Sequence, residues 1–199
     1  MKTNIHDLQR FMDEVLKARS NSEMKERITV IAGTNREASN SSKVAEEYAR
    51  LLNDKGADAQ VFNLREMPHD FLASDMYGLR SEEVERIVEK YIQEVDKYIF
   101  IIPEYNGGFP GILKAFIDCM NPAVFKGKKA GLVGLSSGRT GSLLGMDHFT
   151  GILHYLKVHV HYSKPKLSLI ETILDNEAGT IEGETREKLE EHAQQMIDF

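Results

Sequence analysis

The chain has 199 residues, of which 41% are hydrophobic, and its formal net charge is −6. This size fits one compact domain, because a single core serves chains of up to roughly 250 residues. The negative charge, without any stripe of Lys and Arg, argues against nucleic acid as a partner. No apolar run approaches the ~20 residues that a bilayer requires, so we expect no membrane segment and a cytoplasmic location.

The first residues of the chain form a segment of their own. Over residues 1–27, apolar residues recur at helical spacing until Ser20-Asn21-Ser22 interrupts them. This pattern predicts an N-terminal amphipathic helix and a linker, followed by a main domain over residues 28–199. The apolar stripe has to be covered, either by the main domain or by a partner subunit. It consists of Ile5, Leu8, Phe11, Met12, Val15 and Leu16.

Five short apolar runs predict buried strands, and they alternate with segments of helical periodicity. Because parallel strands need long crossovers, usually helices, the pattern predicts a parallel sheet with helices on both faces. The predicted strands cover residues 28–32, 59–64, 98–102, 129–135 and 158–162. The helices that follow them in turn include residues 44–52, 84–91, 112–120, 146–156 and 189–197.

Two further features lie between these elements. Residues 65–79 form a long connection, and long loops in compact domains often form ligand lids. Cys119 is the only cysteine, which excludes an internal disulfide and suits a reducing compartment. Its place beside Met120 on an apolar helix face predicts a buried thiol without a chemical role.

Ligands of an open parallel sheet bind beyond the carboxyl ends of its strands, so the loops after the first, third and fourth strands are of interest. The first loop, residues 33–42, runs into a helix N-terminus, which offers amides and a positive dipole end to an anion. Its hydroxyl groups and Arg36 add further donors. The residues leave a second interpretation open, an N-capped turn with a solvated arginine. The loop contains neither GxxxxGK[ST] nor GxGxxG.

The loop after the third strand, residues 103–111, is the most informative segment. Its adjacent glycines let the backbone approach a flat ligand, and Tyr105 and Asn106 can supply a ring face and hydrogen bonds. A structural turn does not require two prolines, three glycines and an aromatic residue together. The loop over residues 136–141 faces the same crevice.

These segments resemble the NADPH-dependent FMN reductases of the flavodoxin-like superfamily, which include azo, quinone and chromate reductases. The likeness runs from about Ile28 to Leu174, and Pro103-Glu104-Tyr105-Asn106-Gly107 with Gly111-Ile112-Leu113-Lys114 is its most specific part. The resemblance implies an α/β, flavodoxin-like three-layer sandwich. Its five-stranded parallel sheet would have the order 2-1-3-4-5, with the N-terminal helix added.

The resemblance also implies the cofactor site. The first loop would hold the FMN phosphate, although the family asparagine falls here on Ser41, one place after Asn40. The loop after the third strand would bond the isoalloxazine edge, mainly through backbone groups, and the loop after the fourth would flank the ring. The implied residues are Gly33, Thr34, Arg36, Ser39, Asn40, Ser41, Pro103, Glu104, Tyr105, Asn106, Gly107, Ser136, Ser137, Gly138 and Arg139.

Such an enzyme would pass hydride from NADPH or NADH to FMN, and electrons onward to a quinone, azo compound, free flavin or metal oxyanion. We expect no catalytic side chain, because the cofactor carries the chemistry, and a positioning role for Glu104. We also expect a homodimer or homotetramer, with the helix from Gly111 to Met120 in the contact. One alternative is a non-enzymatic, flavodoxin-like electron carrier, which the scattered acids and the lack of tryptophan disfavour. An interaction module without FMN is a third possibility.

Three histidines raise the question of a metal site. His159 and His161 share one face of the predicted fifth strand, and His154 lies nearby. Metals use such pairs, but no third ligand stands at a recognised spacing. We therefore predict no metal, and expect the strand-end histidines at the surface or at a subunit contact.

Overall fold

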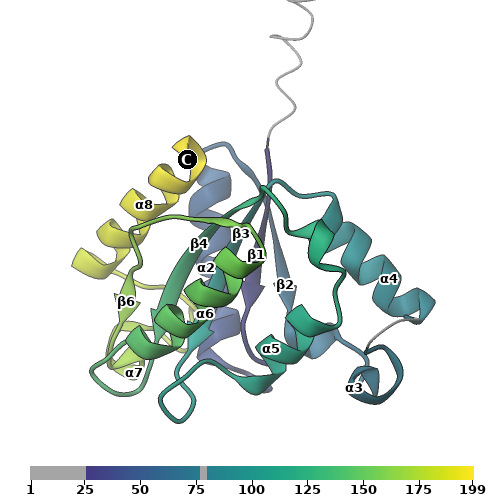
Figure 1. Ribbon diagram of the computed structural model, residues 1–199. Helices are drawn as coiled ribbons and strands as arrows, with labels where there is room; N and C mark the ends of the chain where they lie inside the picture. The colour runs from purple at the N-terminus through teal and green to yellow at the C-terminus, as the bar shows by residue number, and fades with distance from the viewer. Residues whose placement is uncertain (1–25, 77–79) are drawn as a thin grey trace, which may run out of the picture.

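The computed structural model describes residues 26–76 and 80–199. Its core is a parallel sheet in the order β2-β1-β3-β4-β5, with β6 also paired to β4 (Figure 1). The predicted strand order is therefore confirmed. The strands are β1 (Arg27–Ala32), β2 (Asp58–Asn63), β3 (Lys97–Pro103), β4 (Lys129–Leu135), β5 (His159–Val160) and β6 (Lys166–Leu167).

The fifth position of the sheet differs from the prediction of one strand over residues 158–162. Two short strands share it: β5 pairs with the start of β4, and β6 pairs with its end. Pro165 precedes β6 and has no N–H to donate to a ladder, although its carbonyl accepts a hydrogen bond of 2.9 Å from the Gly134 amide. The chain therefore leaves the sheet between the two strands and returns to it.

Helices cover both faces of the sheet, as the alternating pattern predicts (Figure 1). On one face lie α4 (Glu82–Val88), α5 (Gly111–Asp118) and α6 (Leu143–Tyr155), and on the other lie α2 (Asn40–Asp54), α7 (Ile170–Ile173) and α8 (Gly183–Asp198). Short helices fill the connections: a 3-10 turn at Leu64–Glu66, α3 (Phe71–Ser74), a π-helical turn at Glu89–Gln93 and a 3-10 turn at Pro122–Val124.

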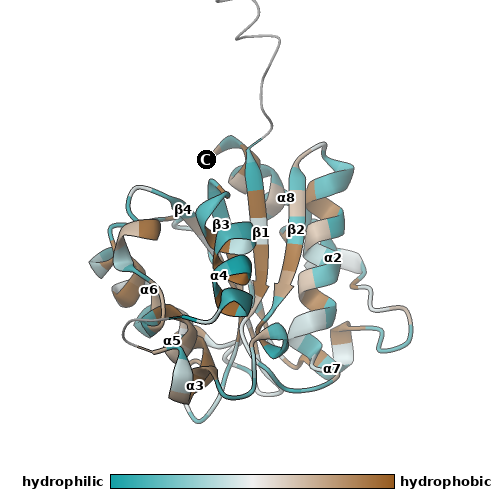
Figure 2. Cartoon of the chain, turned by 90° about the vertical axis from the view of Figure 1, so that its right-hand side faces the viewer, coloured by the Kyte–Doolittle hydropathy of each residue, from teal (hydrophilic) through white to brown (hydrophobic). Residues whose placement is uncertain are grey.

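Apolar side chains of the central strands divide between two cores because successive residues of a strand point to opposite faces. Ile31, Phe100 and Leu132 belong to the core under α4, α5 and α6. Val30 and Ile99 belong to the core under α2 and α8. Every residue of β3 is buried, which accounts for its being the most apolar strand. Figure 2 shows the hydrophobic stretches along β1 and β2.

The predictions for Cys119 and for the strand-end histidines have clear outcomes. Cys119 is buried, as predicted, and burial raises the pKa of its thiol to about 11. His159 is exposed, but His161 is only 6% exposed, so its predicted surface position is wrong. The reason is the C-terminal helix: the rings of His192 and Phe199 pack on His161 with centroids 5.7 and 5.0 Å away.

The predicted N-terminal amphipathic helix lies outside the described residues. β1 begins at Arg27, one residue before the predicted start of the main domain. No helix within the described part of the chain is long and apolar enough to cross a membrane.

Candidate functional site

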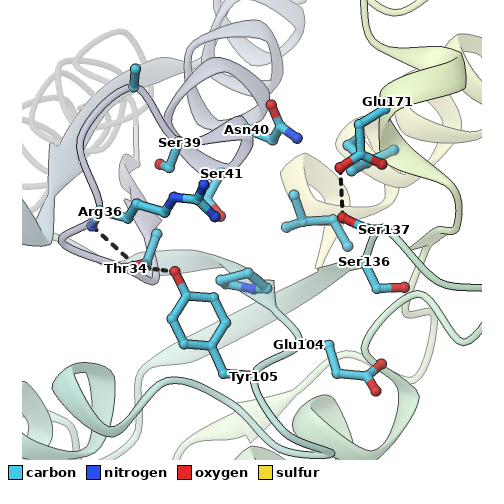
Figure 3. Close-up of a pocket in the computed structure, with 14 residues that line it drawn as sticks. Thr34, Arg36, Ser39, Asn40, Ser41, Glu104, Tyr105, Ser136, Ser137 and Glu171 are labelled. Atoms are coloured by element: carbon cyan, nitrogen blue, oxygen red, sulfur yellow. Dashed lines mark hydrogen bonds between the residues drawn. The ribbon is translucent and has the colours of Figure 1, made fainter.

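A cleft of about 210 Å³ opens where β1, β3 and β4 end (Figure 3). The winding of the sheet reverses here, since β2 lies on one side of β1 and β3 on the other, and such switch points form natural crevices. The loops after these strands and α7 form the walls. The lining residues are Thr34, Arg36, Ala38, Ser39, Asn40, Ser41, Pro103, Glu104, Tyr105, Leu135, Ser136, Ser137, Ile170 and Glu171.

One end of the cleft is the N-terminus of α2. Ser39 caps this helix, because its Oγ accepts a hydrogen bond of 3.1 Å from the Ser42 amide. The first-turn amides of a helix have no partner within the helix, and the helix dipole adds positive potential there. Arg36 reaches the same end and lies near Ser41 (Figure 3). Together these groups are hydrogen-bond donors and positive charges of the kind that binds an anion.

A side-chain hydrogen bond connects this end to the loop after β3. Thr34 Oγ1 accepts the Arg36 amide at 3.2 Å and lies 3.0 Å from the Tyr105 hydroxyl. Thr34 itself is almost fully buried, so its position is determined by packing. These hydrogen bonds hold the loop after β1 and the loop after β3 together.

The loop after β3 contains a tight hairpin. The Tyr105 amide donates to the Gly108 carbonyl at 2.8 Å, and the Gly108 amide returns a bond of 3.1 Å. Asn106 and Gly107 both have positive φ values, 52° and 76°, as a type I′ turn requires. An Asn-Gly pair is the usual signal for this turn. These two residues therefore shape the loop and do not line the cleft.

The loop after β4, residues Ser136–Gly141, forms the opposite wall and is called the β4 loop below. Ser136 Oγ donates to the Gly138 carbonyl at 2.9 Å and accepts the Gly141 amide at 3.0 Å. The Ser168 hydroxyl donates to the Arg139 carbonyl at 2.8 Å. The loop is consequently held in one shape by its own side chains and by the segment around β6.

Two carboxylates also hold the β4 loop. Thr140 Oγ1 donates to Glu104 Oε2, and Ser137 Oγ donates to Glu171 Oε1 at 2.5 Å. The hydrogen bond from Ser137 is the main cause that lowers the pKa of the Glu171 carboxyl. Glu171 is therefore ionised at neutral pH.

The structure brings most of the predicted site residues together. Those that line the cleft are Thr34, Arg36, Ser39, Asn40, Ser41, Pro103, Glu104, Tyr105, Ser136 and Ser137. Those that do not are Gly33, Asn106, Gly107, Gly138 and Arg139. None of the described residues of the long connection over residues 65–79 lines it either, so they provide no lid in this structure.

The structure explains why position 33 is a glycine by close backbone packing, and not by the predicted contact with a ligand. Its amide donates to the Ile101 carbonyl at 2.9 Å, and a Cβ atom at this position would lie 2.6 Å from that same oxygen. Only glycine permits so close an approach of β1 to β3. Gly33 thus fixes the position at which the loop after β1 begins.

Sequence reasoning missed Ile170 and Glu171, which belong to α7 and line the cleft. No local motif marks them. They reach the cleft only because β6 pairs with the end of β4 and α7 follows directly.

Residues 26–165 match the profile of the NADPH-dependent FMN reductase family. The chain belongs to this family. It is 27% identical over 171 residues to a 2-hydroxy-1,4-benzoquinone reductase from Burkholderia sp, a match that covers 82% of this chain and 90% of that protein. It is 28% identical over 172 residues to an NAD(P)H-dependent FMN reductase from Pseudomonas aeruginosa, covering 83% and 90% of the two chains.

Solved structures show the same fold. An NADH:FMN oxidoreductase superposes with a TM-score of 0.72 at 20% identity, covering 87% of this chain and 89% of that chain. A flavoenzyme NAD(P)H:(acceptor) oxidoreductase from Paracoccus denitrificans gives 0.71 at 22% identity, with coverages of 87% and 96%. A flavodoxin from Pseudomonas aeruginosa superposes with a TM-score of 0.54 at 18% identity, covering 84% of this chain and 97% of that chain, so the prediction of a flavodoxin-like fold is confirmed.

As a member of the NADPH-dependent FMN reductase family, the chain is an oxidoreductase that uses FMN and a reduced nicotinamide cofactor. The predicted enzyme class and cofactors are confirmed. The lining of the cleft fits FMN chemically. Its α2 end has hydroxyls, helix amides and the Arg36 guanidinium, which are the groups that a phosphate requires. Among the described residues, no carboxylate pairs with this guanidinium. Pro103 and Leu135 supply apolar surface farther along the cleft.

Proposed function

We propose that this cleft binds FMN with its phosphate at the N-terminus of α2 and its isoalloxazine between the loops after β3 and β4. The observation that carries the proposal is that the two ends of the cleft differ. One end has hydrogen-bond donors suited to an anion, and at the other end the backbone of two loops is held in a fixed shape. Thr34, Arg36, Ser39 and Ser41 would hold the phosphate.

Bound FMN supplies the hydride and electron chemistry, and the protein supplies binding and orientation. The β4 loop and the hairpin after β3 would position the ring, while the Thr34–Tyr105 hydrogen bond keeps the two ends of the site in register. We propose no side-chain acid, base or nucleophile. Because relatives are named as a benzoquinone reductase and an azoreductase, we propose a quinone or an azo compound as acceptor.

A direct test combines binding and turnover. Titration of the apoprotein with FMN should quench flavin fluorescence to a saturable end point, and the loaded protein should oxidise NADPH or NADH continuously when a quinone or azo dye is present. Saturable binding without turnover would favour an electron carrier. Absence of FMN binding would refute the assigned cleft.

We further propose that the enzyme is a homodimer joined through α5 and α6. A groove of about 420 Å³ runs between these helices, with the apolar side chains of Ile117, Met120 and Ile152 in its wall. Tyr155, at the end of α6, lines the groove and is 85% exposed. His148 lines the groove and lies beside Gly108 of the loop after β3, so one end of the groove adjoins a loop that would hold the ring.

A cytoplasmic location also remains a proposal. It is supported by the dependence on reduced nicotinamide cofactor, which cells supply in that compartment, and by the single buried thiol of Cys119.

A further inference from the structure

Glu104 and Glu171 approach the β4 loop from different elements of the fold. Glu104 follows β3 and accepts a hydrogen bond from Thr140, whereas Glu171 belongs to α7 and accepts one from Ser137. Both side chains line the cleft (Figure 3). Holding the two hydroxyls requires only an acceptor oxygen, which a neutral side chain also offers, so the two negative charges add something that the hydrogen bonds do not need.

We propose that Glu104 and Glu171 lower the reduction potential of the bound flavin through their negative charges. The inference rests on the proposed placement of the FMN ring beside the β4 loop. According to this inference, the two residues change the reduction potential of the cofactor and take no part in proton transfer.

The charges of the cleft favour this interpretation. Arg36 is the one cation among the described residues that line it, and it stands at the α2 end, where the phosphate would neutralise it. Arg139 belongs to the β4 loop but does not line the cleft. The end beside the β4 loop is therefore left with two carboxylates and no facing cation.

The hydrogen bonds fix these charges in place. An exposed carboxylate usually samples many rotamers, but here the Ser137 and Thr140 hydroxyls each hold one carboxylate oxygen. Reduction adds electron density to the flavin ring, and a fixed negative charge nearby disfavours that state more than the oxidised one. Solvent screens the effect, because Glu171 is exposed, so a moderate shift is expected. A lower potential makes reduced flavin a stronger donor to an acceptor.

The test removes the charges and keeps the hydrogen bonds. Glutamine at either position still offers a carbonyl oxygen to the Ser137 or Thr140 hydroxyl, so Glu104→Gln, Glu171→Gln and the double variant separate charge from position. For each protein, the Kd of oxidised FMN and that of reduced FMN are measured anaerobically. We expect the ratio of reduced to oxidised Kd to fall about threefold in each single variant and about tenfold in the double variant. For a two-electron couple, tenfold corresponds to a rise in potential of about 30 mV.

Two controls complete the experiment. Glu187→Gln removes an exposed carboxylate of α8 that does not line the cleft, and it should leave the ratio unchanged. Glu171→Ala removes the hydrogen bond to Ser137 as well, so it should also weaken the binding of oxidised FMN.

The outcomes are distinguishable. A ratio that stays at the wild-type value in the double glutamine variant overturns the inference, even if the alanine variant loses affinity, because the role is then only positional. If the wild-type protein binds no FMN, it is the proposed site itself that is wrong.

Discussion

Under the proposed placement of FMN, individual side chains at the α2 end of the cleft would recognise the phosphate. Ser39 both caps the helix and lines the cleft, whereas Arg36 contributes a charge that no carboxylate among the described residues engages. The two therefore act differently. Loss of Ser39 also loosens the helix start, but loss of Arg36 removes only a donor and a positive charge.

Arg36→Ala should weaken FMN binding by roughly 1–3 kcal/mol, because a hydrogen bond to a charged group is lost. Ser39→Ala should have a similar effect, part of it through the lost cap. Fluorescence titration measures both. Arg65→Ala serves as the control, since this exposed arginine does not line the cleft. Flavin affinity equal to that of the wild type in the double variant Arg36→Ala with Ser39→Ala would contradict the assigned phosphate loop.

At the scale of elements, a buried polar contact joins α8 to α2 and to the segment between β5 and β6. The Tyr48 hydroxyl of α2 lies 2.6 Å from His192 Nδ1, and His192 Nε2 lies 3.1 Å from the Ser163 carbonyl. The arrangement fits one neutral tautomer, in which Nε2–H donates to Ser163 and Nδ1 accepts from Tyr48. Burial, and then the charge of nearby His161, lower the pKa of His192 from 6.5 to about 4.

This contact predicts a pH-dependent stability. Between pH 6.5 and 4 the unfolded chain binds a proton at His192 that the folded protein does not, so stability falls as the pH falls through this window. Above pH 6.5, His192 is mostly neutral in both the folded and the unfolded chain, so it adds little pH dependence to the stability. The wild type should lose up to about 3 kcal/mol more than His192→Gln across the window, as measured by urea unfolding. The exposed His159→Gln should behave as the wild type, and parallel curves for wild type and His192→Gln would count against the assignment.

At the scale of the whole molecule, the proposed dimer joins the outer surfaces of α5 and α6. The groove between them combines apolar walls with the charged side chains of Lys114 and Asp118, which pair with each other at 2.6 Å. A mixed surface of this kind suits a subunit contact with a hydrophobic centre.

Tyr155→Glu should convert the dimer to a monomer, because it introduces a charge into the centre of the contact without disturbing the fold of an 85% exposed position. Tyr162→Glu is a matched control, since this tyrosine is 83% exposed and lies outside the groove. Sedimentation equilibrium distinguishes the states. A wild-type protein that is monomeric and fully active would rule the proposal out.

Local patterns in the chain were sufficient for the strands and for a parallel sheet with helices on both faces, whereas the strand order and the individual cleft residues were implied by the family resemblance. Helical and strand periodicity acts over one or two turns or a few alternating residues, so it can be recognised without knowing the neighbouring segments. The loops at 33–42 and 103–111 could be placed together because the carboxyl ends of parallel strands meet at one edge.

Long-range packing decided the remainder. The break between β5 and β6, the burial of His161 under α8 and the arrival of Glu171 in the cleft each depend on which segment lies beside the last strands. Two-residue strands have no periodicity to detect, and a polar side chain does not reveal its partner. These features follow from contacts between residues far apart in sequence, which only the folded chain brings together.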